Sequence, residues 1–163
     1  MTSPAAQARQ TRPEPVEPID ATALETPVPV VDLDRLERNL DRVASYAAEH
    51  QLGLRPHIKT HKTPWIAAEQ LARGAIGLTC ATAFEAEVMS TVAEDLLVAY
   101  PPVTPGRIAR LLALPPEVNL MVALDSADAI ERLAAAARKA QRTVRVLIEL
   151  DVGMHRVGLP EAA

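Results

Sequence analysis

"GLRPHIKTHKTPW" (residues 53–65) carries the pattern that decides the fold. Its segment 54–59 has the length of a β-strand, in which alternate side chains point to opposite faces. One face would be apolar, and the other would carry Arg55, His57 and Lys59. A doubly wound sheet has helices on both faces and therefore needs apolar side chains on both. A strand that is apolar on one face only favours a barrel with helices outside and polar groups inside.

The rest of the chain alternates between strand and helix patterns. Strands are predicted at 27–33, 54–59, 75–81, 95–100, 118–124 and 143–151. Helix starts are predicted at Asp34 with Glu37, at Thr63–Pro64, at Thr82 with Glu85, at Thr104–Pro105 and at Ser126. This alternation with short joints predicts an α/β fold whose parallel sheet is covered by helices. We favour a partial (β/α)8 TIM barrel over a doubly wound sheet, which stays open as the alternative.

The chain is short for such a barrel. A complete (β/α)8 barrel needs eight strands and about 250 residues. The chain has 163 residues, and at most six strands are predicted in it. We therefore expect residues 25–163 to form an incomplete barrel domain that continues in a longer protein. Residues 1–24 are rich in proline and alanine, and we expect a disordered tail because they offer little apolar surface to bury.

Composition excludes several classes of protein. The net charge of −4 and the aromatic content of 2% argue against a nucleic-acid-binding protein, which needs basic surfaces and stacking platforms. Cys80 is the one cysteine, so the chain has no internal disulfide and no cysteine-rich metal site. The N-terminus lacks the apolar core of a secretory signal, and no stretch is long and apolar enough to span a membrane. We expect a cytoplasmic protein with no membrane or nucleic-acid partner.

Lys59 is the strongest candidate for a catalytic residue. It ends a predicted strand, and the carboxyl ends of strands carry the chemistry in α/β folds. Positive neighbours favour the uncharged amine, which attacks carbonyl carbons, and they also attract phosphate. An amine beside a phosphate site suggests pyridoxal phosphate. The alternative is a basic cluster that only forms a solvated surface.

The motif sequence resembles a known family. "LRPHIKTHKTPWIAAEQLARGAIGLTCATAFEAEVM" (54–89) is similar to the D-threonine aldolase and D-serine dehydratase family, fold-type III pyridoxal-phosphate enzymes with an alanine racemase-like barrel. The family signature Arg-Pro-His-x-Lys-Thr-His-Lys matches residues 55–62 at every fixed position. "ETPVPVVDLDRLERNL" (25–40) and "IELDVGMHRVG" (148–158) match as well. By this resemblance the chain is the N-terminal part of such an enzyme.

The resemblance also implies roles for particular residues. Lys59 would be the catalytic lysine that binds pyridoxal phosphate, His57 a wall of the cofactor site, and Arg156 a contact of the cofactor's phenolic oxygen. The strand that carries Lys59 would be the first of about five barrel strands. The strand at 27–33 would instead belong with a C-terminal β-domain that this chain lacks.

The resemblance implies a divalent metal too, with ligands in the absent C-terminal domain. We assign no metal ligand within the chain. His61 and His155 are expected to contact cofactor or solvent, and Glu149 and Asp151 are candidates for side chains inside the barrel. The full-length protein is expected to be a homodimer that acts on a small D-amino acid.

The predicted function is that of a pyridoxal-phosphate-dependent lyase acting on β-hydroxy-D-amino acids. We favour D-threonine aldolase-like cleavage of the Cα–Cβ bond, which gives glycine and an aldehyde. The alternatives are D-serine dehydratase-like deamination, a non-catalytic protein that binds pyridoxal phosphate, and an inert fragment. The 163-residue chain alone is predicted to be inactive.

Overall fold

The computed structural model describes residues 20–160. Most of the segment predicted as a tail, 1–24, lies outside the described residues. The helices are α2 Leu33–Glu49, α3 Pro64–Ala72, α4 Ala83–Met89, α5 Pro105–Leu112 and α6 Ala127–Lys139, with short 3-10 turns η2 Ala21–Ala23 and η3 Ile58–Thr60. The strands are β1 Leu78–Cys80, β2 Asp95–Val98, β3 Asn119–Leu124 and β4 Arg145–Ile148.

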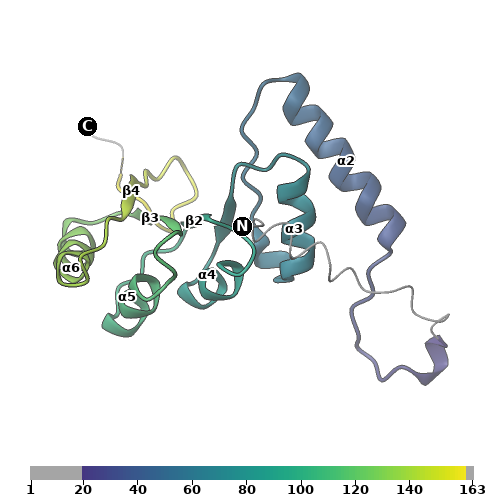
Figure 1. Cartoon of the computed structure of the whole chain (residues 1–163), viewed down its shortest axis with the longest axis horizontal. Helices are drawn as coiled ribbons and strands as arrows, with labels where there is room; N and C mark the ends of the chain where they lie inside the picture. Colours follow the sequence, from purple (N-terminus) through teal and green to yellow (C-terminus); the bar gives the residue numbers. More distant parts are fainter. Residues whose placement is uncertain (1–19, 161–163) are drawn as a thin grey trace.

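The strands form one parallel sheet in the order β1-β2-β3-β4. Each strand therefore pairs with the strand that precedes it in the chain, and helices α4, α5 and α6 connect them along one side of the sheet (Figure 1). A doubly wound sheet would reverse its strand order and place helices on both faces. The consecutive order with helices on one side is that of a partial barrel, so the predicted fold class is confirmed.

The two faces of the sheet differ as the barrel prediction requires. In β2 and β3 the side chains of Leu96, Val98, Leu120 and Val122 are buried against the helices. On the opposite face, Leu97 and Met121 are only partly buried, while the small side chain of Ala123 is buried. The apolar core thus lies between the sheet and helices α3 to α6, and the opposite face is less buried.

Local capping signals placed most helices correctly. The hydroxyl oxygens of Thr82 and Ser126 accept hydrogen bonds from backbone N–H groups three residues later, and α3 and α5 begin at Pro64 and Pro105. The first helix is an exception. Asp32, not Asp34, is its N-cap and accepts from the N–H of Arg35 at 2.9 Å. A carboxylate beside the N-terminus of a helix stabilises its exposed N–H groups, so both aspartates suit this end.

Two predicted strands are not regular strands. Residues 27–32 precede α2 and pair with no strand in the described part of the chain, and the side chains of Val28, Val30 and Val31 are exposed. The segment 54–57 runs alongside β1 and forms only an isolated bridge, between His57 and Thr79. Pro56 has no N–H to donate, although its carbonyl oxygen accepts from Thr79 N at 2.8 Å.

A polar network joins the amino-terminal ends of the strands. The carboxylate of Asp95 lies 2.7 Å from the guanidinium of Arg55, 2.9 Å from the amide of Asn119 and 2.8 Å from the guanidinium of Arg145. Gly77 leaves the space that the Arg55 side chain occupies, because a Cβ at this position would overlap that guanidinium. Since the network spans three strands and the 54–57 segment, it fixes their relative register.

Arg142 fastens the loop that follows α5. Its guanidinium donates hydrogen bonds to the carbonyl oxygens of Leu112, Leu114, Pro115 and Val118. Burial lowers the pKa of Arg142, yet a guanidinium stays charged even so. One side chain thereby satisfies backbone acceptors that would otherwise lack partners at the end of a helix.

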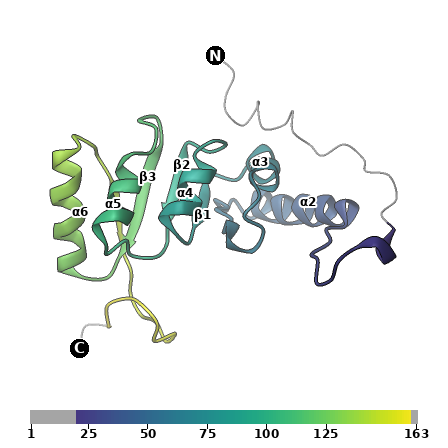
Figure 2. The same cartoon turned by 90° about the horizontal axis from the view of Figure 1, so that it is seen from below.

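Helix α2 and helix α6 lie at opposite ends of the molecule (Figure 2). Strand β4 is the edge of the sheet, and its side chains Val146, Leu147 and Ile148 are exposed on both faces. Within residues 20–160, no helix combines the length and the apolar character needed to cross a lipid bilayer.

Candidate active site

Lys59 lies in the η3 turn that follows the extended segment 54–57, at the carboxyl-terminal end of the neighbouring strand β1. The side chain of Ile58 is fully buried in the core and anchors this turn, while Lys59 is exposed. Among residues 20–160 no ion pair or hydrogen bond involves the Lys59 amine. The turn therefore presents a primary amine at the edge of the sheet where α/β enzymes place their chemistry.

His57 stands directly beside Lys59. Its Nδ1 atom lies 3.3 Å from the backbone N–H of Lys59 and accepts that hydrogen bond, so the neutral ring carries its proton on Nε2. Burial lowers the pKa of His57, as does the charge of Lys59, while the carboxylate of Glu85 raises it. The net direction is downward, which makes His57 a neutral imidazole at neutral pH.

The basic residues of the motif do not act as one positive cluster. Arg55 belongs to the network at the opposite end of the strands, 2.7 Å from Asp95. Lys62 pairs with Glu85 at 2.9 Å. Asp95 and Glu85 therefore neutralise two of the positive charges that were expected around Lys59. Of the motif residues considered, His57 is the one in contact with Lys59.

His61 is partly buried at the start of α3. Its Nδ1 atom accepts from the N–H of Thr63 at 3.1 Å and so caps the first turn of α3, where Thr63 makes no side-chain cap. Burial lowers the pKa of His61, and an interaction of its ring N–H with the side-chain oxygen of Gln70 opposes that shift. The ring thus lies against the start of α3, and the expectation that His61 contacts cofactor or solvent stays a prediction.

The loop after β4 holds Arg156 and is organised by Asp151. The carboxylate of Asp151 accepts from the N–H groups of Gly153 at 3.0 Å and His155 at 2.9 Å, and lies 2.8 Å from Nδ1 of His155. These hydrogen bonds lower the pKa of Asp151. The N–H of Gly158 donates to Asp125 at 3.2 Å, at the end of the adjacent strand. Arg156 is exposed on this anchored loop.

Lys59 and Arg156 both lie at the carboxyl-terminal ends of the strands. Lys59 follows the segment 54–57 beside β1, and Arg156 follows β4 on the other side of the sheet. Four strand spacings of about 4.8 Å would separate them by about 19 Å on a flat sheet. Curvature of a barrel shortens that path, because residues on opposite strands then face each other across the interior. Within residues 20–160, no hydrogen bond or ion pair joins Lys59 to Arg156. Glu149 is half-buried beside the same loop, with its Oε2 atom buried and unpaired among these residues.

Glu85 is the site residue that the sequence analysis missed. It was interpreted only as a capping partner of Thr82, and Thr82 does accept from its N–H at 3.2 Å. Its carboxylate, however, is buried at the strand ends, where it accepts from the N–H of Ala81 at 2.6 Å and pairs with Lys62. The available signal was an acidic residue in the first turn of a helix that directly follows a strand end.

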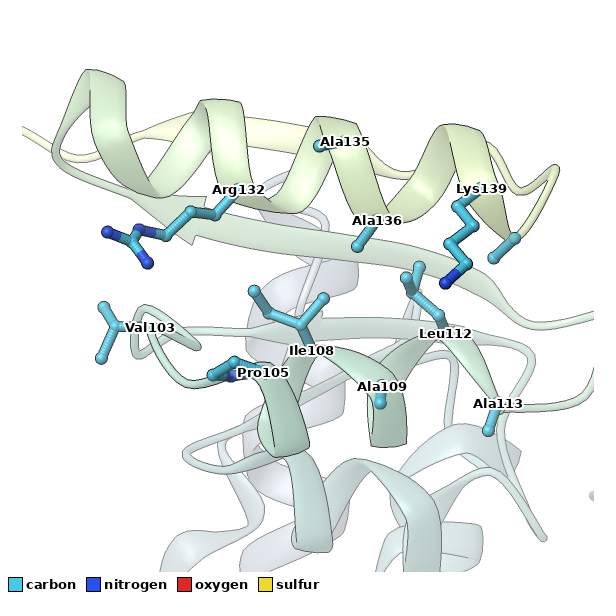
Figure 3. A pocket seen from close by; sticks show the side chains of 11 residues that line it. Val103, Pro105, Ile108, Ala109, Leu112, Ala113, Arg132, Ala135, Ala136 and Lys139 are labelled. Atoms are coloured by element: carbon cyan, nitrogen blue, oxygen red, sulfur yellow. The ribbon is translucent and has the colours of Figure 1, made fainter.

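A groove lies elsewhere, between α5 and α6 on the outer surface (Figure 3). It is lined by alanine and other aliphatic side chains, with Arg132 and Lys139 along its α6 side. Its lining residues, all within the described range, include no acid, histidine or cysteine. The groove therefore offers no carboxylate, imidazole or thiol for acid–base or nucleophilic chemistry, although the amine of Lys139 lies along it.

Residues 20–160 contain neither a candidate metal site nor an exposed thiol. Residues 20–160 contain no group of three or more histidine, cysteine, aspartate and glutamate side chains placed to hold a metal ion. Cys80 is fully buried in the core, and burial raises the pKa of its thiol to about 12. A thiol with such a pKa is a poor nucleophile at neutral pH.

The sequence matches the family described as "Alanine racemase, N-terminal domain" over residues 31–163. The chain belongs to this family. It is 35% identical to a D-threonine aldolase of Arthrobacter sp., over 93% of this chain and 40% of the relative. It is 37% identical to a D-threo-3-hydroxyaspartate dehydratase of Delftia sp. (strain HT23), over 83% of this chain and 36% of the relative.

Solved structures give the same picture. The D-threonine aldolase of Filomicrobium marinum superposes with a TM-score of 0.80 and 36% identity, covering 84% of this chain and 37% of that chain. The D-threo-3-hydroxyaspartate dehydratase of Delftia sp. HT23 superposes with a TM-score of 0.73. The chain spans about two fifths of the length of the curated relatives it matches. The resemblance stated from the motifs is thereby confirmed.

Proposed function

We propose that this chain forms the lysine-bearing part of a pyridoxal-phosphate-dependent lyase that acts on β-hydroxy-D-amino acids. The observation that carries the proposal is the exposed amine of Lys59, which has no partner among residues 20–160 at the carboxyl-terminal edge of a parallel barrel sheet. The names of the relatives, an aldolase and a dehydratase of β-hydroxy-amino acids, support the substrate class.

The residues present fit the cofactor. An unpaired amine suits its aldehyde, and a neutral imidazole at His57 suits the wall of its ring because it adds no charge there. The exposed guanidinium of Arg156, on a loop fixed by Asp151, is the group that we assign to the phenolic oxygen. Bound pyridoxal phosphate supplies an electron sink for charge that develops at the α-carbon of the substrate.

The residues of the chain then have distinct tasks. Lys59 provides the nucleophilic amine, and its Nζ atom can also accept and release a proton. His57 fixes the backbone at Lys59 through the hydrogen bond to its N–H. Asp151 holds the loop that presents Arg156. A divalent metal, which the family resemblance implies, has no ligand cluster within residues 20–160, so we derive no step through it.

The proposed reaction is cleavage of the Cα–Cβ bond, as in D-threonine aldolase. The second candidate is deamination, and the 37% identity to a dehydratase favours keeping it. The products separate the two reactions, because cleavage of D-threonine gives glycine and acetaldehyde while deamination gives ammonia and a 2-oxo acid. A homodimer of the full-length protein belongs to the same proposal, and its mass in solution tests it.

The test uses the full-length protein with pyridoxal phosphate, D-threonine and D-3-hydroxyaspartate. Lys59→Ala is expected to abolish covalent capture of the cofactor and all turnover, because no other described residue offers an unpaired amine at this edge. Lys139→Ala, on the outer face of α6, is the matched control and is expected to behave like the wild type. Borohydride reduction followed by peptide mass spectrometry identifies the modified lysine. Labelling that spared Lys59 would contradict the proposal.

A further inference from the structure

Glu85 has a second partner besides the backbone that it caps. Its side chain is 7% exposed, and its two carboxylate oxygens are used separately. One accepts from the N–H of Ala81 at 2.6 Å, and the other lies 2.9 Å from the amine of Lys62. Burial alone would raise the pKa of Glu85, but the hydrogen bonds from Lys62 and Ala81 outweigh it and the net shift is downward.

The backbone at Lys62 is committed to this contact. Lys62 adopts a φ of +49°, a left-handed conformation that lysine rarely takes, and its N–H donates to the carbonyl oxygen of Ile58 at 2.8 Å. The η3 turn therefore curls back and directs the Lys62 side chain towards α4. This side chain is 64% exposed, so burial does not protect its amine from reagents.

Lys59 and Lys62 lie on either side of His57 and Glu85. The charge of Lys59 lowers the pKa of His57 and the charge of Glu85 raises it, so both groups act on the same imidazole. Glu85 in turn holds Lys62. Two primary amines three residues apart thus share a small site, and only one of them is paired with a carboxylate.

We propose that Glu85 is a positioning residue that holds Lys62 as a paired ammonium and so leaves Lys59 as the amine that captures the cofactor aldehyde. This inference rests on the proposed function of Lys59. An ammonium bound to a carboxylate has no lone pair to offer a carbonyl carbon. A buried carboxylate without its cation would lose most of its stabilisation, which keeps the pair closed.

A purely structural role for Glu85 makes a different prediction. As a helix cap, Glu85 needs only an oxygen that accepts from the N–H of Ala81. Glu85→Gln keeps that acceptor and the shape of the side chain, but removes the charge that holds Lys62. The variant therefore separates capping from selection between the lysines.

The experiment is reductive labelling of the full-length protein with pyridoxal phosphate. Each amine condenses with the aldehyde and releases water, and borohydride then supplies the hydride that makes the bond permanent. Peptide mass spectrometry gives the ratio of label on Lys62 to label on Lys59, with Lys139 as the internal surface reference. Glu85→Gln is expected to raise this ratio about fivefold or more relative to the wild type.

A double variant distinguishes competition from distortion of the turn. In Lys62→Arg with Glu85→Gln, the motif has no second amine near Lys59, so within the motif label is expected on Lys59 alone and at the wild-type extent. If Glu85 acted only by holding the turn, labelling of Lys59 would fall in Glu85→Gln and would not recover in the double variant. That result, or an unchanged ratio in Glu85→Gln, overturns the inference while the assignment of Lys59 stands. If the wild-type protein carries no label on Lys59, both the inference about Glu85 and the assignment of Lys59 are wrong.

A measurement on the wild type needs no substitution. In cofactor-free protein, trace acetylation with acetic anhydride is expected to modify Lys62 about fivefold or more slowly than Lys59 and Lys139, despite its exposure. Equal rates at Lys62 and Lys59 would overturn the proposal even if Glu85→Gln failed to fold.

Discussion

Gly77→Ala tests whether the polar network at the amino-terminal strand ends depends on a missing side chain. Gly77 has a φ of +155°, and a Cβ added there would overlap the guanidinium of Arg55 and stand 2.6 Å from the carbonyl oxygen of Asp95. A non-glycine residue in such a conformation costs about 1–3 kcal/mol, and overpacking against fixed neighbours costs about as much again. We expect Gly77→Ala to lower the free energy of unfolding by about 3–5 kcal/mol.

The assay is urea-induced unfolding of the full-length protein, followed by circular dichroism. Gly106→Ala is the matched control, because Gly106 lies within α5 and its Cβ would meet nothing within 4 Å. Alanine favours a helix over glycine, so this change is expected to stabilise by about 0.5–1 kcal/mol. The same chemical change thus has opposite signs at the two positions.

A double variant addresses the cause. With Arg55→Ala in place, the overlap with the guanidinium disappears. The loss in free energy of unfolding caused by Gly77→Ala should then be smaller by at least about 1 kcal/mol than in the presence of Arg55. The reasoning is refuted if Gly77→Ala changes the free energy of unfolding by less than about 0.5 kcal/mol, a change typical of surface positions. It is also refuted if Arg55→Ala leaves the cost unchanged.

Two further predictions concern the half-buried guanidinium of Arg142 and the imidazole of His61. Arg142→Ala should lower the free energy of unfolding by about 2–4 kcal/mol, since several charge-assisted hydrogen bonds are lost together; thermal unfolding measures this, with exposed Arg138→Ala as control. The pKa of His61 is lowered from 6.5 chiefly by burial. The unfolded chain then binds more protons just below pH 6.5, so stability is complete above that pH and falls on acidification. His61→Asn keeps an acceptor for Thr63 and should flatten this fall.

These two predictions fail on clear results. Equal effects of Arg142→Ala and Arg138→Ala would mean that the carbonyl oxygens find water at no cost. An unchanged loss of stability between pH 6.5 and pH 5 in His61→Asn would mean that other groups govern the acid response.

Short-range signals explain which parts of the fold the sequence predicted. Thr82 and Ser126 cap their helices through N–H groups only three residues away, and Pro64 and Pro105 fit the first turn of a helix wherever they occur. The barrel prediction used strand alternation, which is also local. At the start of α2 two aspartates compete for one cap, and nothing in the sequence ranks Asp32 above Asp34.

Contacts between distant segments explain the rest. Arg55 was grouped with Lys59 by sequence proximity, but it pairs with Asp95, forty residues away, at the other end of the strands. The pairing of Lys62 with Glu85 depends on a left-handed backbone at Lys62 that its side chain does not favour. The segment 54–59 alternates like a strand, yet Pro56 cannot donate a ladder hydrogen bond and η3 follows at Ile58.

The consecutive strand order has a consequence for synthesis on the ribosome. Each strand pairs with the strand made just before it, and the paired residues Asp95 and Asn119 are 24 positions apart. At about 5–20 residues per second, the next strand emerges within about 1–5 s of its partner. The sheet can therefore be laid down in the order of translation, with the exposed edge at β4 as the template for whatever is synthesised next.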